Sequence, residues 1–548
     1  MRFSRQVGFF GRVTKLLNRV RRFYFSVSGI LSPDTPQTRR NAGFFTGDSQ
    51  CWICRLCRPQ LAILAFVLAF PAAAQELPRL ERRGEATQLL VEGEPFLILG
   101  GELGNSSASD RQYLHGRWAK LQAMHLNTVL APVSWELIEP EEGQFDFATV
   151  DWLLEDARAH DMRLVLLWFG TWKNSMSSYA PAWVKRDTAR FPRTTGADGR
   201  AQEIVSAFSR NAREADARAF AALMRHLRKA DGGHRTVIMV QVENEVGFLP
   251  FAKEGGNSRD LAADERAMAR AYAFYVEAVA AAGKREYALP LFVNGAQGRP
   301  GVKPGDYPSG GPLAHLAQVW REGAPSIDFI APDIYFPSFA AITDGYVASG
   351  NPLFIPEANR PSDARVAANA LRSIGQLKAM GFSPFAIEDA SEAEARRIGG
   401  LYAMLESIAP LVLAAQAEAR IAGFGNPVSF AGETDLAPLK ATLGEAAFTA
   451  TTIDPWTPRE AQDPSTHGAV LIWLGGEDYL LAGQGVTLTV EPADGQGRLG
   501  FERVEEGRYE AGEWRPGRRL NGDQTHQGRH VRLPPGAFGV QRFQLYRY

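Results

Sequence analysis

Cysteine is scarce in this sequence, and none lies in the region that shows regular secondary-structure patterns. All three cysteines, Cys51, Cys54 and Cys57, sit close together near the N-terminus of the 548-residue chain. Their spacing loosely resembles an iron–sulfur ligand run, but no fourth cysteine follows it. We interpret them as chance cysteines in a segment that export removes. A processed protein would then have no disulfides and would depend on a large hydrophobic core.

Other absences narrow the class of protein further. No glycine-rich loop with a phosphate-binding signature precedes a helix, and no histidine pair has zinc-binding spacing. The net charge is only −1. Residues 1–60 hold 11 Lys/Arg against 2 Asp/Glu, a balance of +9, so the remaining residues carry −10. A mildly acidic body argues against nucleic acid or an anionic membrane surface as the main partner.

A short apolar run near the N-terminus predicts export. Residues 61–70 are apolar, follow two arginines and precede a Pro-Ala-Ala-Ala sequence that ends at Ala74. We therefore predict that residues 1–74 are a basic extension and signal peptide, cleaved near Ala74, and that the protein is periplasmic or secreted. A retained membrane anchor is the alternative, although about ten apolar residues are short for a span. Residues 1–50 are either an over-long predicted start or an unusual basic extension.

Short apolar runs alternate with helical patterns over residues 75–424. A hairpin over residues 87–100, with its turn at 92–94, leads into the first strand of the series. The other expected strands are 127–132, 163–168, 236–242, 289–293, 327–332, 353–356 and 384–387, and the expected helices are 110–124, 148–159, 212–230, 262–282, 312–321, 363–379 and 393–421. Repeated strand–helix units predict an α/β fold, the (β/α)8 TIM barrel. A doubly wound sheet is the competitor, and it is less favoured because polar residues follow almost every strand.

The pattern changes after residue 425. Residues 425–548 lose helical periodicity and consist of short apolar runs separated by Gly, Pro and Asp, such as 468–474, 486–490 and 540–548. This pattern predicts an antiparallel β-sandwich domain that follows the barrel.

Two of the expected barrel strands end in carboxylates. The run 236–247 delivers Gln241, Glu243, Asn244 and Glu245, and the run 351–360 delivers Glu357. Glu245 and Glu357 are 112 residues apart, a gap of about three strand–helix units, so the two side chains can face each other across the mouth of a barrel. For Glu243 we expect a structural role, paired with Arg or Lys.

Such a pair of carboxylates is typical of glycoside hydrolysis with retention of configuration. One carboxylate attacks the anomeric carbon, and the other protonates the leaving oxygen and later deprotonates a water. The two carboxyl groups must then lie about 5–5.5 Å apart. The acid needs a raised pKa, and the nucleophile needs hydrogen-bond donors, for which Tyr335 is a candidate.

Aromatic residues cluster near the predicted strand ends, where flat rings can pack on the face of a sugar. We expect about half of them to be packing residues instead. The cluster comprises Trp135, Trp168, Phe169, Trp172, Trp183, Trp320, Tyr335 and Phe336.

These motifs resemble those of a known family. Residues 241–245, Gln-Val-Glu-Asn-Glu, resemble the acid/base signature of family 35 β-galactosidases, in the large clan of retaining (β/α)8 glycosidases. Residues 133–147 resemble that family's Trp…Glu-Pro…Gly-Phe-Asp-Phe stretch, and Glu357 lies where its nucleophile lies. The resemblance covers roughly residues 90–420, and the last domain resembles a β-domain appended in a bacterial branch.

The resemblance implies a retaining exo-β-galactosidase that uses Glu245 as acid/base and Glu357 as nucleophile, with Asn244 on the sugar 2-hydroxyl. The sequence departs from the family where Val246 replaces the usual Tyr and where Glu102–Ser106 replaces an Ile-His-Tyr type sequence. The expected substrate contacts are Asn244, Tyr335, Asn105, Trp135, Glu136, Asn294, Glu102 and Trp168.

We expect a carbohydrate substrate, no metal or organic cofactor, no nucleic acid and, after signal cleavage, no membrane. A homo-oligomer stays open. The alternatives are another β-glycosidase of the clan, acting on a galactan, arabinoside or glucoside, and a non-catalytic glycan-binding protein.

Overall fold

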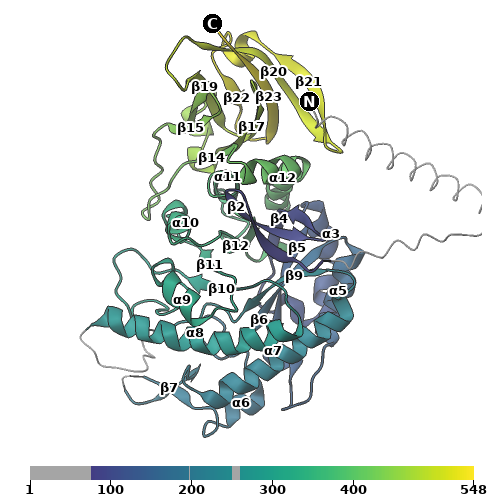
Figure 1. The fold of residues 1–548 in the computed structure, drawn as a ribbon, viewed down its shortest axis with the longest axis vertical. Helices are drawn as coiled ribbons and strands as arrows, with labels where there is room; N and C mark the ends of the chain where they lie inside the picture. The colour runs from purple at the N-terminus through teal and green to yellow at the C-terminus, as the bar shows by residue number, and fades with distance from the viewer. Residues whose placement is uncertain (1–75, 197, 250–259) are drawn as a thin grey trace, which may run out of the picture. The chain divides into compact units, whose positions relative to one another are not determined.

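Eight parallel strands form a closed barrel, as the sequence predicted. The structure is a computed structural model that describes residues 76–196, 198–249 and 260–548, so the predicted extension and signal peptide lie outside the described residues. Around the barrel the strand order is β10-β11-β12-β13-β4-β5-β6-β9, and β10 pairs with β9 to close it (Figure 1). The barrel strands are β4 (Ile98–Glu102), β5 (Thr128–Ser134), β6 (Arg163–Phe169), β9 (Val237–Val242), β10 (Leu291–Ala296), β11 (Phe329–Ile334), β12 (Ile355–Ala358) and β13 (Gly381–Pro384).

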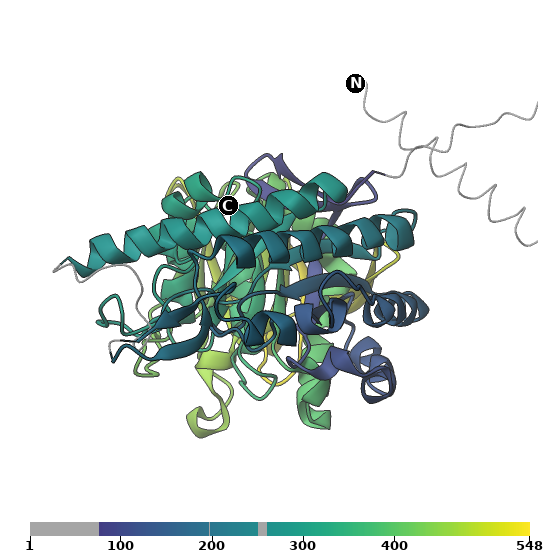
Figure 2. The ribbon, with the colours of Figure 1, turned by 90° about the horizontal axis from the view of Figure 1, so that it is seen from below.

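Helices between the strands cover the outside of the barrel. They are α2 (Arg111–His115), α3 (Trp118–Ala123), α4 (Trp135–Ile138), α5 (Ala148–Ala159), α6 (Ala182–Arg186), α7 (Arg210–Asp231), α8 (Leu261–Glu286), α9 (Ala317–Gly323), α10 (Phe339–Ala348), α11 (Val366–Gly375) and α12 (Glu392–Ala417). The two long helices α7 and α8 lie side by side in both views (Figures 1 and 2). The side chain of Ser209 accepts a hydrogen bond from the Ala212 amide and so caps the start of α7. The sequence did not predict α10.

Alternation along each strand divides the core into an inner and an outer layer. In β6, Leu167 and Phe169 belong to a cluster with Phe292 of β10 and with Phe354, which directly precedes β12, and this cluster fills the barrel interior. The residue between them, Trp168, packs instead against Phe220 of α7, on the outer side. Successive side chains of a strand point to opposite faces, so this division follows from the backbone.

A small antiparallel sheet precedes the barrel. Its strands are β1 (Arg79–Arg83), β2 (Ala86–Val91) and β3 (Glu94–Phe96). Leu89 and Val91 of β2 join the same cluster as the inner barrel residues. The predicted hairpin therefore forms between β2 and β3, while residues 98–100 of its predicted range belong to barrel strand β4. The apolar side of β2 covers the barrel interior.

The eighth strand lies earlier in the chain than the sequence predicted. It covers Gly381–Pro384 instead of 384–387, and Ile387–Asp389 form a turn of 3-10 helix. The chain leaves the strand through Ala386, whose φ of 53° is left-handed. The apolar run 379–387 contains no turn residue after Pro384 that would mark this end, so the pattern misplaced it.

The C-terminal region forms two antiparallel sheets around its own core, as predicted. One sheet has the order β14-β17-β18-β23-β20-β21 and the other β15-β16-β19-β22. Their strands are β14 (Ile421–Gly425), β15 (Leu439–Leu443), β16 (Ala446–Thr451), β17 (Gly468–Gly475), β18 (Asp478–Gln484), β19 (Val486–Pro492), β20 (Leu499–Glu510), β21 (Glu513–Leu520), β22 (Val531–Leu533) and β23 (Gly539–Arg547). The predicted domain boundary at 424/425 stays a prediction, and β14 begins ahead of it.

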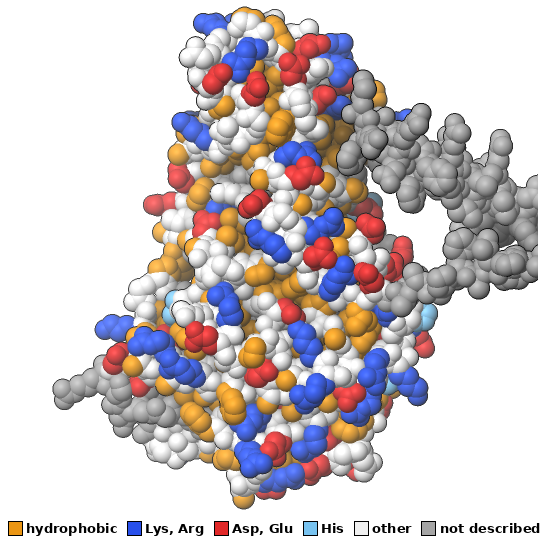
Figure 3. All heavy atoms as spheres, in the orientation of Figure 1, with side chains coloured by type: hydrophobic (Ala, Val, Ile, Leu, Met, Phe, Trp, Pro, Cys, Tyr) orange, Lys and Arg blue, Asp and Glu red, His pale blue; other side chains and the backbone are white. Residues whose placement is uncertain are grey.

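Helix α12 is long and apolar enough, by length and composition, to cross a membrane. In the fold, 56% of its most apolar window is buried. The hydroxyl of Tyr402 in α12 donates to the carbonyl groups of Gly100 and Phe382 in two barrel strands, at 2.8 and 2.9 Å. These contacts are those of a core helix. On the face seen in Figure 3, acidic and basic side chains are interspersed over the described residues.

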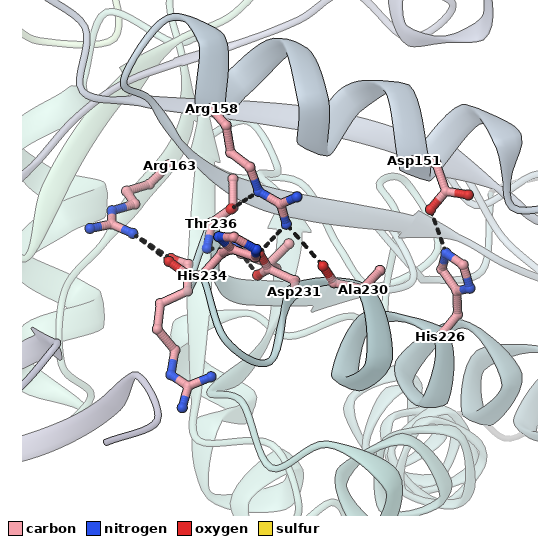
Figure 4. A network of polar contacts seen from close by, with 10 residues as sticks. Asp151, Arg158, Arg163, His226, Ala230, Asp231, His234 and Thr236 are labelled. Carbon is pink, nitrogen blue, oxygen red and sulfur yellow. Dashed lines mark hydrogen bonds and ion pairs between the residues drawn. The ribbon is translucent and has the colours of Figure 1, made fainter. Parts of the chain in front are cut away.

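A polar network ties helices to strands at the N-terminal end of β9. Arg158 donates to Asp231 at 2.7 Å and to the hydroxyl of Thr236 at 2.8 Å (Figure 4). The carboxylate of Asp231 also accepts from the amides of Thr236 and Val237, at 3.0 and 2.8 Å. Asp231 is fully buried, and its charge is neutralised by a cation and by backbone donors.

Candidate active site

The predicted carboxylates meet at the C-terminal ends of the strands. Glu245 follows β9, Glu357 lies in β12, and both are buried. With Asp333 of β11, each offers a carboxylate oxygen, and the three oxygens lie within 4.8 Å of one another. The expectation that Glu245 and Glu357 approach each other across the mouth is therefore confirmed. The separation fits direct attack better than the roughly 6.5–9.5 Å that leaves room for a water.

Glu357 has a hydrogen-bond donor on one oxygen only. The Tyr335 hydroxyl donates to Oε1, as the sequence predicted. Oε2 is buried and has no hydrogen-bond partner among the described residues. Burial first, and the charge of Glu357 second, raise the pKa of Glu102 well above its usual range. The protonated form of Glu102 is therefore favoured beside Glu357.

Glu245 is held in an unusual backbone conformation. Its φ is 46°, and its amide donates to Asn294 Oδ1 at 3.0 Å. The side-chain amide of Asn174 donates to Glu245 Oε2, and the hydroxyl of Ser175 donates to the Glu245 carbonyl at 2.8 Å. Burial, followed by the negative charge of Glu357, raises the pKa of Glu245 to about 7. A carboxyl group with such a pKa can give or take a proton near neutral pH.

Asp333 and Asn294 form a buried support beneath Glu245. Asn294 Nδ2 donates to Asp333 Oδ2 at 2.5 Å. Burial raises the pKa of Asp333 well above its usual range, and the charges of Glu357 and Glu245 add to this shift. Because Asn294 bonds both Glu245 and Asp333, its amide is used inside the protein, and the structure gives it a supporting place instead of the expected sugar contact.

Lys173 places a positive charge among these carboxyl groups. It is buried, follows β6, and donates to Asn244 Oδ1 at 2.9 Å. Burial lowers the pKa of Lys173, but the negative charge around it, that of Glu357 first, outweighs this effect and raises it. The ammonium therefore stays charged. Asn244 Nδ2 is buried without a partner among the described residues, so it remains as a donor for a ligand.

Several residues of the site escaped the sequence prediction. Lys173, Asn174 and Asp333 were not singled out, although all three are polar residues at or just after the end of a predicted strand. Another is Glu388, whose Oε1 accepts hydrogen bonds from the Gly104 amide at 2.9 Å and from the Ser107 hydroxyl. These two bonds fix the loop after β4.

That loop carries Asn105, whose Oδ1 is buried without a described partner. An unpaired buried acceptor is costly unless a ligand satisfies it, so Asn105 keeps its predicted place as a substrate contact.

Three predicted contacts do not reach this cluster. Trp168 points to α7, where its ring N–H donates to Asp216 at 2.9 Å. Trp135 is fully buried and donates to Glu139 at 2.8 Å. The side chain of Glu136 is 40% exposed and pairs with Lys185 at 3.4 Å. The alternation of side chains along β6 places Trp168 on the outer side of the barrel. In α4, which follows β5, Trp135 is bonded to Glu139 and Glu136 is paired with Lys185.

The expected cation partner of Glu243 is replaced by a carboxyl group. Glu243 accepts hydrogen bonds from the amides of Thr171 and Trp172, at 3.2 and 2.7 Å, and is hydrogen-bonded to Asp216. The expectation of an Arg or Lys partner is therefore wrong.

The three clustered carboxylates are also a donor set that suits a hard cation. Glu245, Asp333 and Glu357 could each supply one oxygen, as Mg²⁺ and Ca²⁺ prefer. Lys173 already supplies positive charge to this group, and Asp333 holds its proton. The arrangement therefore fits acid–base and nucleophilic chemistry without a metal.

Two facing carboxylates at the mouth of a barrel are the arrangement that retaining (β/α)8 glycosidases use, and comparison with known proteins points to the same class. Residues 106–253 match the model of a family described as beta-galactosidase, glycosyl hydrolase family 42. The matching model is of family 42, whereas the motifs resemble family 35, and both are β-galactosidase families. Residues 398–532 match a domain of unknown function, DUF5597.

Individual relatives are also named as beta-galactosidases or beta-galactosidase-like proteins. The chain is 31% identical over 200 residues to a beta-galactosidase of Xanthomonas manihotis, which is 34% of this chain and 30% of that protein. It is 45% identical over 58 residues to human Beta-galactosidase-1-like protein 3, or 11% of this chain and 9% of that protein. The chain thus aligns with less than a third of the length of these curated relatives.

Among solved structures, the beta-galactosidases of Rahnella sp. R3 and Bacillus circulans sp. alkalophilus are similar to this chain. The first has a TM-score of 0.45 and 16% identity, over 61% of this chain and 57% of that one. The second has a TM-score of 0.44 and 14% identity, over 58% and 57%.

Proposed function

We propose that the protein is a retaining exo-β-galactosidase that releases terminal β-galactosyl residues from oligo- or polysaccharides. The observation that carries the proposal is the pair Glu245 and Glu357, whose carboxylate oxygens lie within 4.8 Å at the mouth of the barrel. The family match over residues 106–253 supports galactose as the sugar. The finer assignment to family 35 rests on the motifs at 133–147 and 241–245.

In the first step Glu357 is the nucleophile. One of its oxygens forms a bond to the anomeric carbon while the bond from that carbon to the glycosidic oxygen breaks. Glu245 gives its proton to the leaving oxygen and becomes a carboxylate. The hydroxyl of Tyr335 supports the ionised form of Glu357 before attack, because it donates to Oε1.

In the second step the roles of the two glutamates follow from their charges. Glu357 is now an ester and has lost its negative charge. The charge of Glu357, one cause of the raised pKa of Glu245, is thereby removed. The pKa of Glu245 falls, and Glu245 is now a carboxylate with no second glutamate anion beside it. It takes a proton from a water, which attacks the anomeric carbon as the bond to Glu357 breaks.

The free donors and acceptors are suited to a polar sugar. Asn244 Nδ2 offers a hydrogen bond to a hydroxyl, and Lys173 fixes the orientation of that amide by bonding its oxygen. Asn105 Oδ1 and Glu357 Oε2 offer acceptors. Each such atom costs free energy while it stays unpaired, so a ligand that satisfies it gains affinity.

The proposal is tested by removing each glutamate separately. Glu357→Gly should abolish turnover of a nitrophenyl β-galactoside, and azide should restore it with inverted product, because the small anion takes the place of the nucleophile. Glu245→Gln should remove the acid. Near wild-type turnover by either variant would overturn the assignment of roles. Fast turnover of another nitrophenyl glycoside, with none of the galactoside, would replace galactose as the substrate.

The place of action is proposed from the N-terminal sequence alone. The apolar run at 61–70 and the small residues that end at Ala74 support export to the periplasm or the medium. N-terminal sequencing of protein recovered from the periplasmic fraction tests this. A start near Gln75 is expected, and recovery of the unprocessed chain in the cytoplasm would contradict it.

A further inference from the structure

Two fully buried carboxyl groups lie beside the proposed site and take no part in the steps above. Asp216 of α7 is 0% exposed and Glu243, just after β9, is 1% exposed. The Thr171 amide donates to both, to Asp216 Oδ2 at 3.1 Å and to Glu243 Oε1 at 3.2 Å. A side chain at Gly170 would lie 2.7 Å from Glu243 Oε1 and 2.9 Å from Asp216 Oδ1, so the two groups close around this glycine.

Two adjacent carboxylates cannot both be ionised in such a place without a cation. Among the described residues, the groups that donate hydrogen bonds to the pair carry no positive charge, and uncompensated buried charge is strongly unfavourable. The Thr171 hydroxyl also lies 2.7 Å from the hydroxyl of Tyr275 in α8. Arg213 acts through its charge on Tyr275 and on Glu214. One proton between the two carboxyl groups removes the conflict.

The donors show which group is the anion. Asp216 accepts three hydrogen bonds that occupy both of its oxygens, from Trp168 Nε1 at 2.9 Å and from the amide and hydroxyl of Thr171 at 3.1 and 2.8 Å. Glu243 Oε2 accepts from the Trp172 amide at 2.7 Å, whereas Oε1 receives only the long, shared bond of Thr171. Oε1 of Glu243 is therefore the place for the proton, and Asp216 accepts it.

The pair is connected to the proposed site through one residue, Trp172. The amide of Trp172 donates to Glu243, and the carbonyl of Trp172 accepts from the Asn244 amide at 3.2 Å. The consecutive residues Glu243 and Asn244 thus bind the N–H and the C=O of Trp172, the residue that precedes Lys173. Glu243 and Glu245 both have left-handed φ values, 60° and 46°, and so do Asn174 and Ser175 opposite them, 51° and 62°. Such conformations are unfavourable for residues other than glycine and persist only where the surroundings hold them.

We propose that Asp216 and Glu243 share one proton, and that this protonated pair positions the loops that carry Asn174 and Glu245. Glu243 is then a positioning residue, since it contacts neither substrate nor reacting atoms. In support, burial and the charge of Asp216 raise the pKa of Glu243 well above its usual range. The effect on turnover rests on the proposed function, whereas the shared proton does not.

Substitutions at position 243 test whether the Glu243 side chain is a protonated acid or an ionised carboxylate. Glu243→Gln keeps a donor toward Asp216 and an acceptor toward the Trp172 amide, so kcat should stay within about threefold of wild type. Glu243→Ala removes both and should lower kcat by roughly 100-fold, the effect of a displacement of about 1 Å. Asp216→Asn should be worse than Glu243→Gln, because its NH2 group must face a donor at either oxygen. Equal loss in Glu243→Gln and Glu243→Ala would overturn the proposal.

Two further readouts do not depend on turnover. The infrared difference between wild type and Glu243→Gln at neutral pH should contain the C=O stretch of a protonated carboxylic acid. Because the folded state holds the Glu243 proton more tightly than the unfolded chain, its stabilising contribution is complete below the unfolded pKa of about 4.3 and is lost as pH rises through the raised value. The Tm of Glu243→Gln relative to wild type should therefore increase with pH.

The other carboxyl groups with raised pKa are common to both proteins and cancel in these comparisons. Absence of the acid band from the difference spectrum, or a Tm difference that does not change with pH, would show that Glu243 is ionised and would overturn the proposal. A protein that shows both signals but hydrolyses no galactoside would instead contradict the proposed function alone.

Discussion

The buried carboxylates at the two ends of β9 differ in how completely they are paired. At the N-terminal end, Asp231 receives a cation and two backbone amides, and the neighbouring Thr236 hydroxyl accepts from Arg158. At the C-terminal end, Glu245 has Asn174 on one oxygen, and Glu357 across from it has an oxygen without a described partner. The carboxylates at both ends are buried, so burial alone does not distinguish a structural carboxylate from one that is available to a ligand. The number of hydrogen bonds that each carboxylate already accepts distinguishes the two kinds.

The largest expected effect comes from the mouth. Glu357→Gln should lower kcat/KM on a β-galactoside by about 10⁴-fold or more, as loss of a nucleophile typically does. The same change removes a negative charge from a group of buried carboxyls, so the Tm should not fall. Enzyme assays and thermal melts on the same sample check both. Substantial destabilisation by Glu357→Gln would remove the distinction between the two ends.

The matched change at the other end should have the reverse outcome. Asp231→Asn leaves Arg158 without its carboxylate, and breaking a buried ion pair costs about 3–5 kcal/mol of unfolding free energy. Because Asp231 lies at the opposite end of the barrel from Glu245, kcat of the folded protein should be unchanged. Urea unfolding measures the first quantity and an assay well below the melting temperature the second. A large loss of kcat with wild-type stability would contradict this.

A smaller effect is expected from Lys173, a cation that acts on the mouth carboxyls among the residues that the structure describes. Lys173 lowers the pKa of Glu245, which is about 7. Glu245 must be protonated to act as the acid, so activity should fall as pH rises through this value. Lys173→Met should raise that pKa and move the basic limb of the kcat/KM profile to higher pH, and it should also lower kcat because Asn244 loses a charge-assisted bond. Lys173→Arg, the control, should leave the limb in place, and a shift to lower pH in Lys173→Met would contradict the argument.

The smallest effect concerns metal. If Lys173 and the protonated Asp333 already compensate the charge of the carboxyl cluster, then dialysis against a chelator should leave kcat/KM unchanged, and added Mg²⁺ or Ca²⁺ should not raise it. A chelator that inactivates the enzyme, with recovery on adding one of these ions, would show that the three clustered oxygens hold a cation.

Much of the barrel could be predicted because its signals are local. Short β-branched runs followed by polar residues gave strands close to the observed ones, and α5 coincides with its predicted range. The eighth strand was misplaced because the apolar run around it continues past its end. Helix α10 was missed because its residues, Phe339–Ala348, are nearly all apolar or small and show no polar face.

The candidate site was predicted in part for the same reason. Glu245 and Glu357 lie at the ends of strongly apolar strands, and Tyr335 was predicted correctly as a hydrogen-bond donor to Glu357. The prediction of Trp168 as a substrate contact relied on its residue type and ignored its position in the strand. The alternation of side chains along β6 places Trp168 on the outer side of the barrel. The partnership of Glu243 with Asp216 could not be read from sequence, because it joins a strand end to the middle of a helix and pairs two groups of like charge.

The sheet before the barrel has a consequence for the order of events. Leu89 and Val91 of β2 pack with the side chains that fill the barrel interior, so the barrel is closed below the site. A sugar bonded to Glu357 would lie between this closed interior and the leaving group. Under the proposed function, the leaving group must depart before the water arrives, and galactose must leave last, through the opening by which the substrate entered.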